Sequence, residues 1–180
     1  LTRVVAGPLC AQMLGDLGAE IVKLERQGNG DDLRALGPPF VTGSDDSTYF
    51  TSLNRNKRSL SLDFTQAEGA AILKRIVAKA DVLIENFRTG TLARYGLGYD
   101  DLRAINPRLV YCSVTGFGQS GPYAHRSGYD FVAQAMAGLM GLARKGYFKA
   151  GEKVLFMHTG GLPALHMYEN EVLGRVAVAD

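Results

Sequence analysis

Basic side chains flank several of the strands that the sequence predicts. They form two groups, with Arg55, Lys57 and Arg58 just before one strand, and Arg26, Arg88 and Arg94 at or just beyond the ends of others. Arginine offers a planar fork that matches phosphate, and lysine offers a compact charge. With the Asn86 amide, the set therefore suits a ligand that carries phosphates. Any one residue alone is better explained as solvated surface charge, so it is their shared position that indicates a site.

A glycine motif further along has the spacing of a nucleotide-binding turn but not its context. Gly116, Gly118 and Gly121 match G-x-G-x-x-G and follow a predicted strand. The dinucleotide motif needs its third glycine in the first turn of a helix, whereas here Pro122 follows and no helix opens. We therefore predict no nicotinamide site, and we interpret residues 116–128 as a flexible loop of the kind that covers a substrate.

The C-terminal segment offers two further candidates, each with a simpler explanation. His166 and Glu169 lie one turn apart on a predicted helix, but no third ligand has a suitable spacing, so we predict no metal site. Thr159-Gly160-Gly161-Leu162-Pro163 has the shape of an anion cradle, or equally of a tight strand-to-helix turn. No Gly-x-Ser-x-Gly sequence supplies a serine nucleophile.

The elements that position these residues alternate between strands and helices. Strands are predicted at 21–24, 58–63, 82–84, 109–114 and 154–157, and helices at 8–17, 65–80, 100–105, 129–143 and 163–172. In the clearest helix, Thr65 and Glu68 form a capping-box pair and an apolar face follows. Pro8 is expected at the first position of its helix and Gly18 in a left-handed cap.

This alternation predicts an α/β fold, with a parallel sheet and helices on both faces. Ile21, Val22 and Leu24 are expected to form a buried strand, and the Gly-, Asp- and Pro-rich residues 26–46 a long loop. Ligands bind at the carboxyl ends of parallel strands. The loops after Leu24, Ile84 and Val114 are therefore where we expect the chemistry.

Composition excludes several classes of protein. With 180 residues, 46% of them hydrophobic, the chain is long enough for one core and short for two, so we expect a single domain. A net charge of +2 is too small for a protein whose main partner is a nucleic acid or an anionic membrane. No apolar run reaches the about 18 residues of a membrane span, and Cys10 and Cys112 lack metal-type spacing. We expect a soluble, cytoplasmic protein with reduced cysteines.

Three stretches resemble the class III CoA-transferases, the group of formyl-CoA transferase, carnitine CoA-transferase and methylacyl-CoA racemase. They are LTRVVAGPLCAQMLGDLGAEIVKLER, DSTYFTSLNRNKRSLSLDF and the segment from ADVLIENFRTG to GYDFVAQAMAGLM, in this order within residues 1–140. The resemblance implies a Rossmann-like CoA-binding part, an interlocked homodimer, and transfer of CoA from a thioester to a carboxylic acid. It implies no required cofactor.

The same resemblance implies which residues contact CoA. These are Val5, Ala6, Arg26, Leu62, Asp63, Phe64, Thr65, Asn86, Phe87, Arg88, Arg94, Arg126, Ser127, Gly128 and Tyr129. The nucleophile of the family is an aspartate in a Gly-Asp segment beyond Tyr129, which takes the acyl group as a mixed anhydride. No aspartate lies between Asp130 and Asp180, so we expect a truncated form without the nucleophile and assign no catalytic residue.

Residues 141–180 resemble a different family. GLARKGYFKAGEKVLFMHTGGLPALHMYE is similar to the C-terminal part of D-cysteine desulfhydrase and aminocyclopropane-carboxylate deaminase, which use pyridoxal phosphate. The Schiff-base lysine and phosphate loop of those enzymes have no counterpart here, so we expect no pyridoxal phosphate site. We predict a chimera joined around residues 135–142. Two alternatives stay open: a catalytically silent CoA-binding or dimerising module, and a remnant of a pyridoxal-dependent desulfhydrase.

Overall fold

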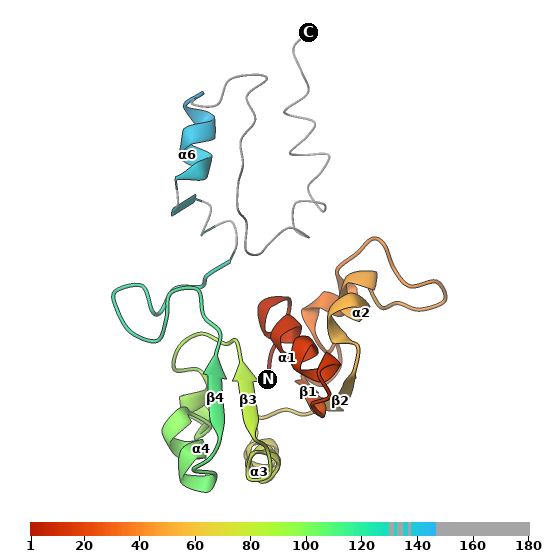
Figure 1. Ribbon diagram of the computed structural model, residues 1–180, viewed down its shortest axis with the longest axis vertical. Helices are drawn as coiled ribbons and strands as arrows, with labels where there is room; N and C mark the ends of the chain where they lie inside the picture. Colours follow the sequence, from red (N-terminus) through yellow and green to blue (C-terminus); the bar gives the residue numbers. More distant parts are fainter. Residues whose placement is uncertain (130–131, 133–134, 137, 147–180) are drawn as a thin grey trace. The chain divides into compact units, whose positions relative to one another are not determined.

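The computed structural model describes residues 1–129, 132, 135–136 and 138–146, and the chain divides into two units, Leu1–Ser127 and Gly128–Asp180. The first unit contains, in order, α1 (Ala6–Asp16), β1 (Ile21–Glu25), the 3-10 helix η1 (Asp32–Ala35), α2 (Thr48–Asn54), β2 (Lys57–Ser61), α3 (Ala67–Val77), β3 (Val82–Glu85), the 3-10 helix η2 (Leu92–Tyr95), α4 (Tyr99–Ile105) and β4 (Val110–Ser113) (Figure 1). The described part of the second unit contains α6 (Leu139–Arg144).

The strands of the first unit form two parallel pairs. β1 pairs with β2, with Glu25 opposite Ser61, and β3 pairs with β4, with Glu85 opposite Ser113. A helix lies between the two strands of each pair along the chain, as a parallel connection requires. This arrangement confirms the predicted α/β class with parallel strands. It also brings the carboxyl ends of paired strands to the same edge.

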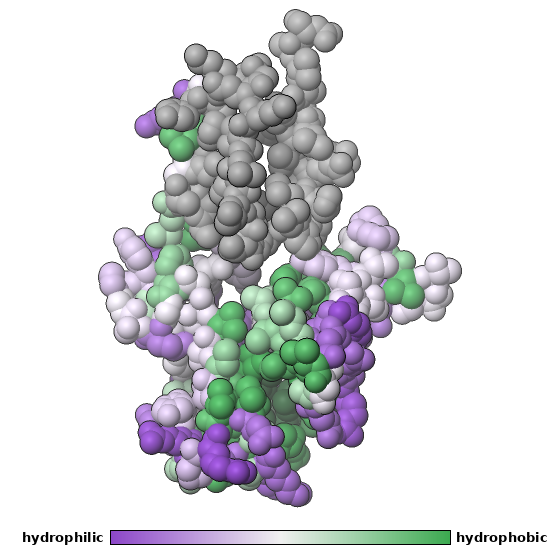
Figure 2. All heavy atoms as spheres, viewed as in Figure 1, coloured by the Kyte–Doolittle hydropathy of each residue, from purple (hydrophilic) through white to green (hydrophobic). Residues whose placement is uncertain are grey.

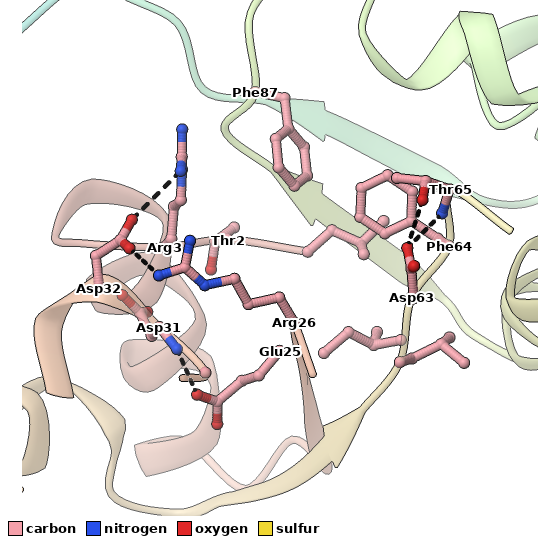
Figure 3. A pocket seen from close by; sticks show the side chains of 14 residues that line it. Thr2, Arg3, Glu25, Arg26, Asp31, Asp32, Asp63, Phe64, Thr65 and Phe87 are labelled. Atoms are coloured by element: carbon pink, nitrogen blue, oxygen red, sulfur yellow. Dashed lines mark hydrogen bonds and ion pairs between the residues drawn. The ribbon is translucent and has the colours of Figure 1, made fainter. Parts of the chain in front are cut away.

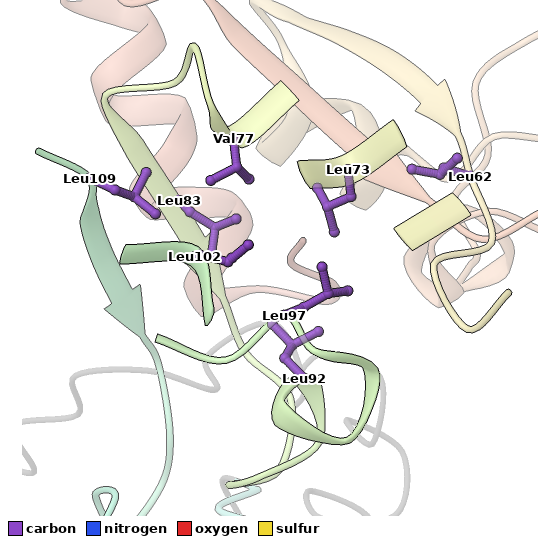
Figure 4. Close-up of a cluster of buried hydrophobic side chains, with 8 residues drawn as sticks. All are labelled: Leu62, Leu73, Val77, Leu83, Leu92, Leu97, Leu102 and Leu109. Carbon is purple, nitrogen blue, oxygen red and sulfur yellow. The ribbon is translucent and has the colours of Figure 1, made fainter. Parts of the chain in front are cut away.

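The hydrophobic core of this unit joins α3 and α4 to the second strand pair (Figure 4). Eight buried side chains form it: Leu62, Leu73, Val77, Leu83, Leu92, Leu97, Leu102 and Leu109. Each fully buried leucine contributes on the order of 2 kcal/mol of stability. The Asn106 amide adds a polar tie, donating to the carbonyl oxygens of Val77 and Ala80 at 3.0 and 2.7 Å. These bonds satisfy backbone acceptors at the end of α3.

The start of α3 differs from the sequence prediction. The helix is present, but its N-cap is Gln66 and no side chain caps it, so the Thr65–Glu68 capping box is wrong. The Thr65 hydroxyl instead donates to Asp63 Oδ1 at 2.6 Å, and the Thr65 amide donates to the same oxygen at 2.9 Å. This local turn occupies Thr65 before the helix begins.

The first strand also buries different residues from those expected. Val22 is 36% exposed, whereas Lys23 and Glu25 are 5% and 6% exposed. Alternate residues of a strand point to opposite sides, so the two charged side chains share the inner face. The prediction of a buried face at Val22 is therefore wrong. Charged partners on the following loop make this burial possible.

Helices near the N-terminus follow the predictions in part. α1 begins at Ala6, so Pro8 lies within its first turn rather than at its first position. Gly18 has a φ of +100° and ends the helix as expected, with its amide bonded to the Gly15 carbonyl oxygen at 3.0 Å. Helix α2 was not predicted; Ser47 caps it by accepting from the Phe50 amide at 3.0 Å.

Several predictions concern the C-terminal part of the chain. A helix was predicted at 129–143; the described residues there contain α6, preceded by Gly138 with a φ of +82°. The predicted strand 154–157 and helix 163–172 lie outside the described residues, as do His166, Glu169 and the 159–163 turn. Of the helices that the structure describes, none is long and apolar enough to cross a membrane.

Gly69 tests how closely α3 packs on the chain before it. A Cβ atom at Gly69 would overlap the Asp63 carbonyl oxygen. We expect Gly69→Ala to lower the free energy of unfolding by about 1–3 kcal/mol, because backbone has to move. Urea denaturation measures this change. Gly141→Ala in α6 is the control, since a Cβ there meets no atom within 4 Å; an equal loss in both variants would contradict the close contact.

Candidate functional site

A pocket of about 180 Å³ lies where β1, β2 and β3 end (Figure 3). Leu24, Glu25 and Arg26 come from the end of β1, the Leu62–Thr65 segment follows β2, and Phe87 follows β3. The N-terminal residues up to Arg3 and the 30–32 segment complete the lining. The pocket therefore lies at the carboxyl ends of parallel strands. It includes residues from two of the three predicted loops, those after Leu24 and Ile84, but no lining residue follows Val114, and the segment after β2 was not among the predicted loops.

The structure brings together some of the predicted contact residues. The pocket is lined by six of them: Arg26, Leu62, Asp63, Phe64, Thr65 and Phe87. Asn86 joins them indirectly through Arg3. Phe64 and Phe87 meet edge to face, with ring centroids 5.5 Å apart, and they lie across the pocket from Arg26 in Figure 3. One side of the pocket is thus aromatic and the other is charged.

Other predicted residues lie away from this lining. Val5, Ala6, Arg88, Arg94, Arg126 and Ser127 do not line the pocket, and Gly128 and Tyr129 belong to the second unit. Arg88 Nε donates to Ser127 Oγ at 2.9 Å, and Thr89 Oγ1 donates to the Ala124 carbonyl oxygen at 2.9 Å. These two hydrogen bonds join the loop after β4 to the loop after β3. Arg88 and Ser127, both predicted to contact CoA, therefore lie together but do not line the pocket.

The basic residues before β2 have structural partners. Arg55 binds Asp16 at 2.5 Å, and Arg58 pairs with Glu20. Lys57 donates to the Pro8 and Leu53 carbonyl oxygens at 2.7 Å. Burial, together with the nearby positive charge of Lys23, lowers the pKa of Lys57 to about 8. These residues lie at the amino end of β2 and do not line the pocket, so the structure does not bring them together with Arg26, and a role for them in binding phosphate stays a prediction.

Arg3 reaches the pocket through a strained turn. Its backbone amide donates to Asn86 Oδ1 at 3.0 Å, and its carbonyl oxygen accepts from Asn86 Nδ2 at 2.7 Å. Val4 then has a φ of +63°, a left-handed conformation that is unfavourable for a β-branched residue. Asp31 Oδ1 accepts from the Val4 amide at 3.1 Å. Side chains from two distant segments thus hold this turn in place.

Sequence reasoning missed the buried charges beneath the pocket. Lys23 Nζ lies 2.6 Å from Asp31 Oδ2, with both side chains almost fully buried. Glu25 accepts from Arg34 Nε and Nη2, both at 2.8 Å, and from Ser59 Oγ at 2.7 Å. The one available signal was the pair of charges two residues apart inside the strand IVKLE, which places them on one face.

This network fixes the ionisation of Glu25. Burial opposes ionisation of its carboxyl, but hydrogen bonds from Arg34 and Ser59 outweigh burial and lower the pKa to about 2. The same contact with Glu25 raises the pKa of the Arg34 guanidinium, although burial opposes it. The Arg34 guanidinium also lies 3.8 Å from the centroid of the Phe50 ring. Both groups stay charged at any physiological pH.

The pocket has the chemistry of a binding site for a partly apolar anion. Two guanidinium groups, of Arg3 and Arg26, reach its rim, and apolar and aromatic side chains form its walls. Across the described residues, no three His, Cys, Asp or Glu side chains form a group able to hold a metal ion. Glu25 and Asp31 are held in ion pairs, which makes their carboxylates poor nucleophiles.

Comparison with known proteins gives consistent matches. A family model described as CoA-transferase family III matches residues 1–166. The chain is 48% identical over 167 residues to succinate–glutarate CoA-transferase of Agrobacterium fabrum, covering 89% of this chain and 42% of that protein. It is 53% identical over 140 residues to succinyl-CoA:glutarate CoA-transferase of Mus musculus, covering 78% and 32%. The crystal structure of a CAIB/BAIF family protein from Brucella suis matches with a TM-score of 0.76 and 43% identity, over 98% of this chain and 47% of that chain.

Two facts follow from these matches. The chain spans less than half the length of these relatives. The family match continues to residue 166, well past the join predicted at 135–142. The comparisons therefore give no support to the predicted desulfhydrase-like segment.

Replacing Glu25 tests the network under the pocket. A carboxyl whose pKa drops from its ordinary 4.5 to about 2 contributes on the order of 3 kcal/mol at neutral pH. We expect Glu25→Gln to lower the free energy of unfolding by about that amount at pH 7, measured by urea denaturation. Because the folded-state pKa is depressed, the wild-type protein loses this contribution as the pH falls from about 5 to 2. The difference in the free energy of unfolding between wild type and Glu25→Gln therefore becomes smaller over the same pH range.

Asp46→Asn provides the matched control, because Asp46 binds the same Arg34 at 2.8 Å from a more exposed position. Its loss is expected to change stability by less than about 1 kcal/mol. A difference in the free energy of unfolding between wild type and Glu25→Gln that stays constant from pH 7 to pH 2 would show that the pKa of Glu25 is not depressed.

Proposed function

Because the chain belongs to CoA-transferase family III, we propose that it takes part in moving CoA between carboxylic acids and that the pocket at the ends of β1, β2 and β3 binds CoA. One observation carries the proposal: Arg3 and Arg26 share this pocket with Phe64 and Phe87. CoA carries phosphates, which suit guanidinium groups, and apolar and ring portions, which suit the aromatic walls.

The chemical step needs a carboxylate outside this pocket. In the proposed reaction a side-chain carboxylate attacks the thioester carbon, the C–S bond breaks, and CoA leaves as the thiolate while a mixed anhydride forms. The thiolate then attacks the side-chain carbonyl of the anhydride, which releases the first acid as its carboxylate and leaves CoA as a thioester of the side chain. The acceptor carboxylate displaces CoA from this thioester to form a second mixed anhydride, and the thiolate attacks the acceptor's acyl carbon, giving the new acyl-CoA and the free side-chain carboxylate. Glu25 is a poor candidate for the nucleophile because Arg34 holds it. We propose that the described residues bind CoA and that an acidic residue elsewhere in the complete enzyme attacks.

A second candidate function is CoA binding without transfer. It is favoured by the ion pairing of Glu25 and Asp31 and by the absence of any aspartate between Asp130 and Asp180. The two candidates share the binding site and differ only in turnover. A pyridoxal-dependent function gains no support from the comparisons, and we do not propose it.

The names of the relatives suggest which acids to test. Two are named for transfer between succinate or succinyl-CoA and glutarate. We propose short dicarboxylic acids as the substrate class of the complete enzyme. The predicted cytoplasmic location remains a prediction.

CoA binding is the direct test. A ligand that binds only the folded state at about 100 times its Kd raises the free energy of unfolding by about 2.7 kcal/mol. We expect CoA to raise the melting temperature in a concentration-dependent way. Arg26→Gln should weaken CoA binding by about tenfold or more, because a charge-assisted hydrogen bond is lost. Isothermal titration calorimetry measures the dissociation constants.

Arg55→Gln is the matched control, since Arg55 also pairs with an aspartate but lies outside the pocket. It should leave the CoA affinity unchanged. No thermal response to saturating CoA would refute the binding proposal. Binding without turnover of succinyl-CoA and glutarate would favour the second candidate.

We also propose a homodimer, on the basis of an apolar stripe formed by α1 and its C-cap residue. Leu9 and Met13 of α1 and the C-cap Leu17 follow one another at intervals of four residues and are 40%, 62% and 86% exposed. Apolar surface is visible in Figure 2 in the region that α1 occupies in Figure 1. Exposed apolar stripes of this kind mark protein interfaces.

Sedimentation velocity tests whether the apolar stripe forms a dimer interface. Replacing Met13 and Leu17 with serine should shift the protein from dimer to monomer while leaving its secondary structure intact, as circular dichroism would show. The same double substitution at Tyr99 and Ile105, which are also exposed, is the control. A wild-type protein that is monomeric at all concentrations would exclude the dimer.

A further inference from the structure

The Asp32 carboxylate lies between the two guanidinium groups of the pocket. Oδ1 is 2.5 Å from Arg26 Nη2, and Oδ2 is 3.3 Å from Arg3 Nη1 (Figure 3). Each carboxylate oxygen thus binds a different arginine. The three side chains are 44–55% exposed, so solvent reaches all of them. Exposed ion pairs are weak, and a stronger anion can replace one partner.

The backbones of the two arginines are held in position by contacts other than Asp32. The Arg3 backbone is fixed by its two hydrogen bonds to Asn86, and the left-handed Val4 follows directly. Arg26 follows the last residue of β1, whose register with β2 is fixed. Both arginines therefore keep their backbone positions at the pocket when their contact with Asp32 is broken, and their side chains are free to bind another anion.

Asp32 differs from the other acidic residues that line the pocket. Glu25 is bound by Arg34, Asp31 by Lys23, and Asp63 by the Thr65 hydroxyl and amide. None of those three is bound to Arg3 or Arg26 among the hydrogen bonds and ion pairs of the described residues. Asp32 is therefore the carboxylate with which an incoming anion has to compete.

We propose that Asp32 is an internal anion of the pocket, which occupies Arg3 and Arg26 in the absence of ligand and gives them up to a phosphate group of the ligand. The inference rests on the proposed function in taking CoA as the natural ligand, and it adds Arg3 as a second phosphate-binding residue. A phosphate offers more acceptor oxygens than a carboxylate and carries more charge, so it displaces the Asp32 carboxylate from both guanidinium groups. Asp32 thereby weakens binding of any small free anion and makes release of the ligand easier.

The test compares Asp32→Asn with Asp16→Asn, using inorganic pyrophosphate and CoA as probes in titration calorimetry at fixed, low ionic strength. Asp16 is the matched control because it also binds an arginine, Arg55, at 2.5 Å, but outside the pocket. Asp31, not Asp32, caps η1, so the Asp32 variant keeps that cap. We expect Asp32→Asn to bind pyrophosphate about tenfold more tightly than wild type. Asp16→Asn should bind it as wild type does.

A double variant tests whether the gain in pyrophosphate affinity depends on Arg3. Adding Arg3→Gln to Asp32→Asn should remove most of the gain in pyrophosphate affinity. Unchanged or weaker pyrophosphate binding by Asp32→Asn would overturn the inference, and so would a gain that persists without Arg3. Asp32→Ser, which also removes the charge, gives the same comparison if the asparagine variant is poorly folded.

The outcomes separate this inference from the proposed function. Wild-type CoA binding with no effect of Asp32→Asn keeps the proposed function and rejects the internal anion. A tighter pyrophosphate complex in Asp32→Asn, without any CoA binding by wild type, supports the internal anion and rejects the CoA site.

Discussion

Ion pairs of two buried strand residues determine where the chain runs after β1. Lys23 and Glu25 point to the same inner face of the strand, and each finds its partner on the following segment, Asp31 and Arg34. Because an unpaired buried charge is strongly unfavourable, few conformations of that segment are compatible with both pairs. Asp32 lies between the two partners in the sequence, so its position at the pocket rim follows from the same constraint.

The candidate site is assembled from segments that are distant in the sequence. The ends of parallel strands bring Arg26, Phe64 and Phe87 together, and the Asn86 amide binds the N-terminal segment beside them. The aromatic side of the pocket contacts the hydrophobic core, since Phe64 and Phe87 pack against the buried leucine cluster. Packing of the core and the shape of the pocket are therefore coupled.

The sequence predicted the main strands and helices better than the short helix α2 and the cap of α3. Hydrophobic runs and periodicity placed all four described strands and helices α3 and α4, because burial of apolar faces decides those elements. The seven-residue helix α2 was missed, since so short a segment shows little periodicity and depends on the Ser47 cap. The Thr65–Glu68 capping box failed because Asp63 competes for the Thr65 hydroxyl.

The site could be predicted only in part for a related reason. The resemblance to a known family named Arg26, Leu62–Thr65 and Phe87, which the structure gathers into one pocket, but the role of each in binding CoA stays a prediction. Arg3 and Asp32 could not be found, because their contact depends on the fold of the intervening chain. Lys23 and Glu25 were overlooked because a charged residue in a strand is normally expected to face solvent.

The pairing of Lys23 with Asp31 also limits how this protein can diverge. Replacing either residue alone leaves a buried charge without its counterion, so a lineage that loses one passes through a poorly folded intermediate. Exchange for a neutral pair requires two coordinated changes. Among descendants of this chain, the two positions should be inherited together or lost together, although they are separated in the sequence.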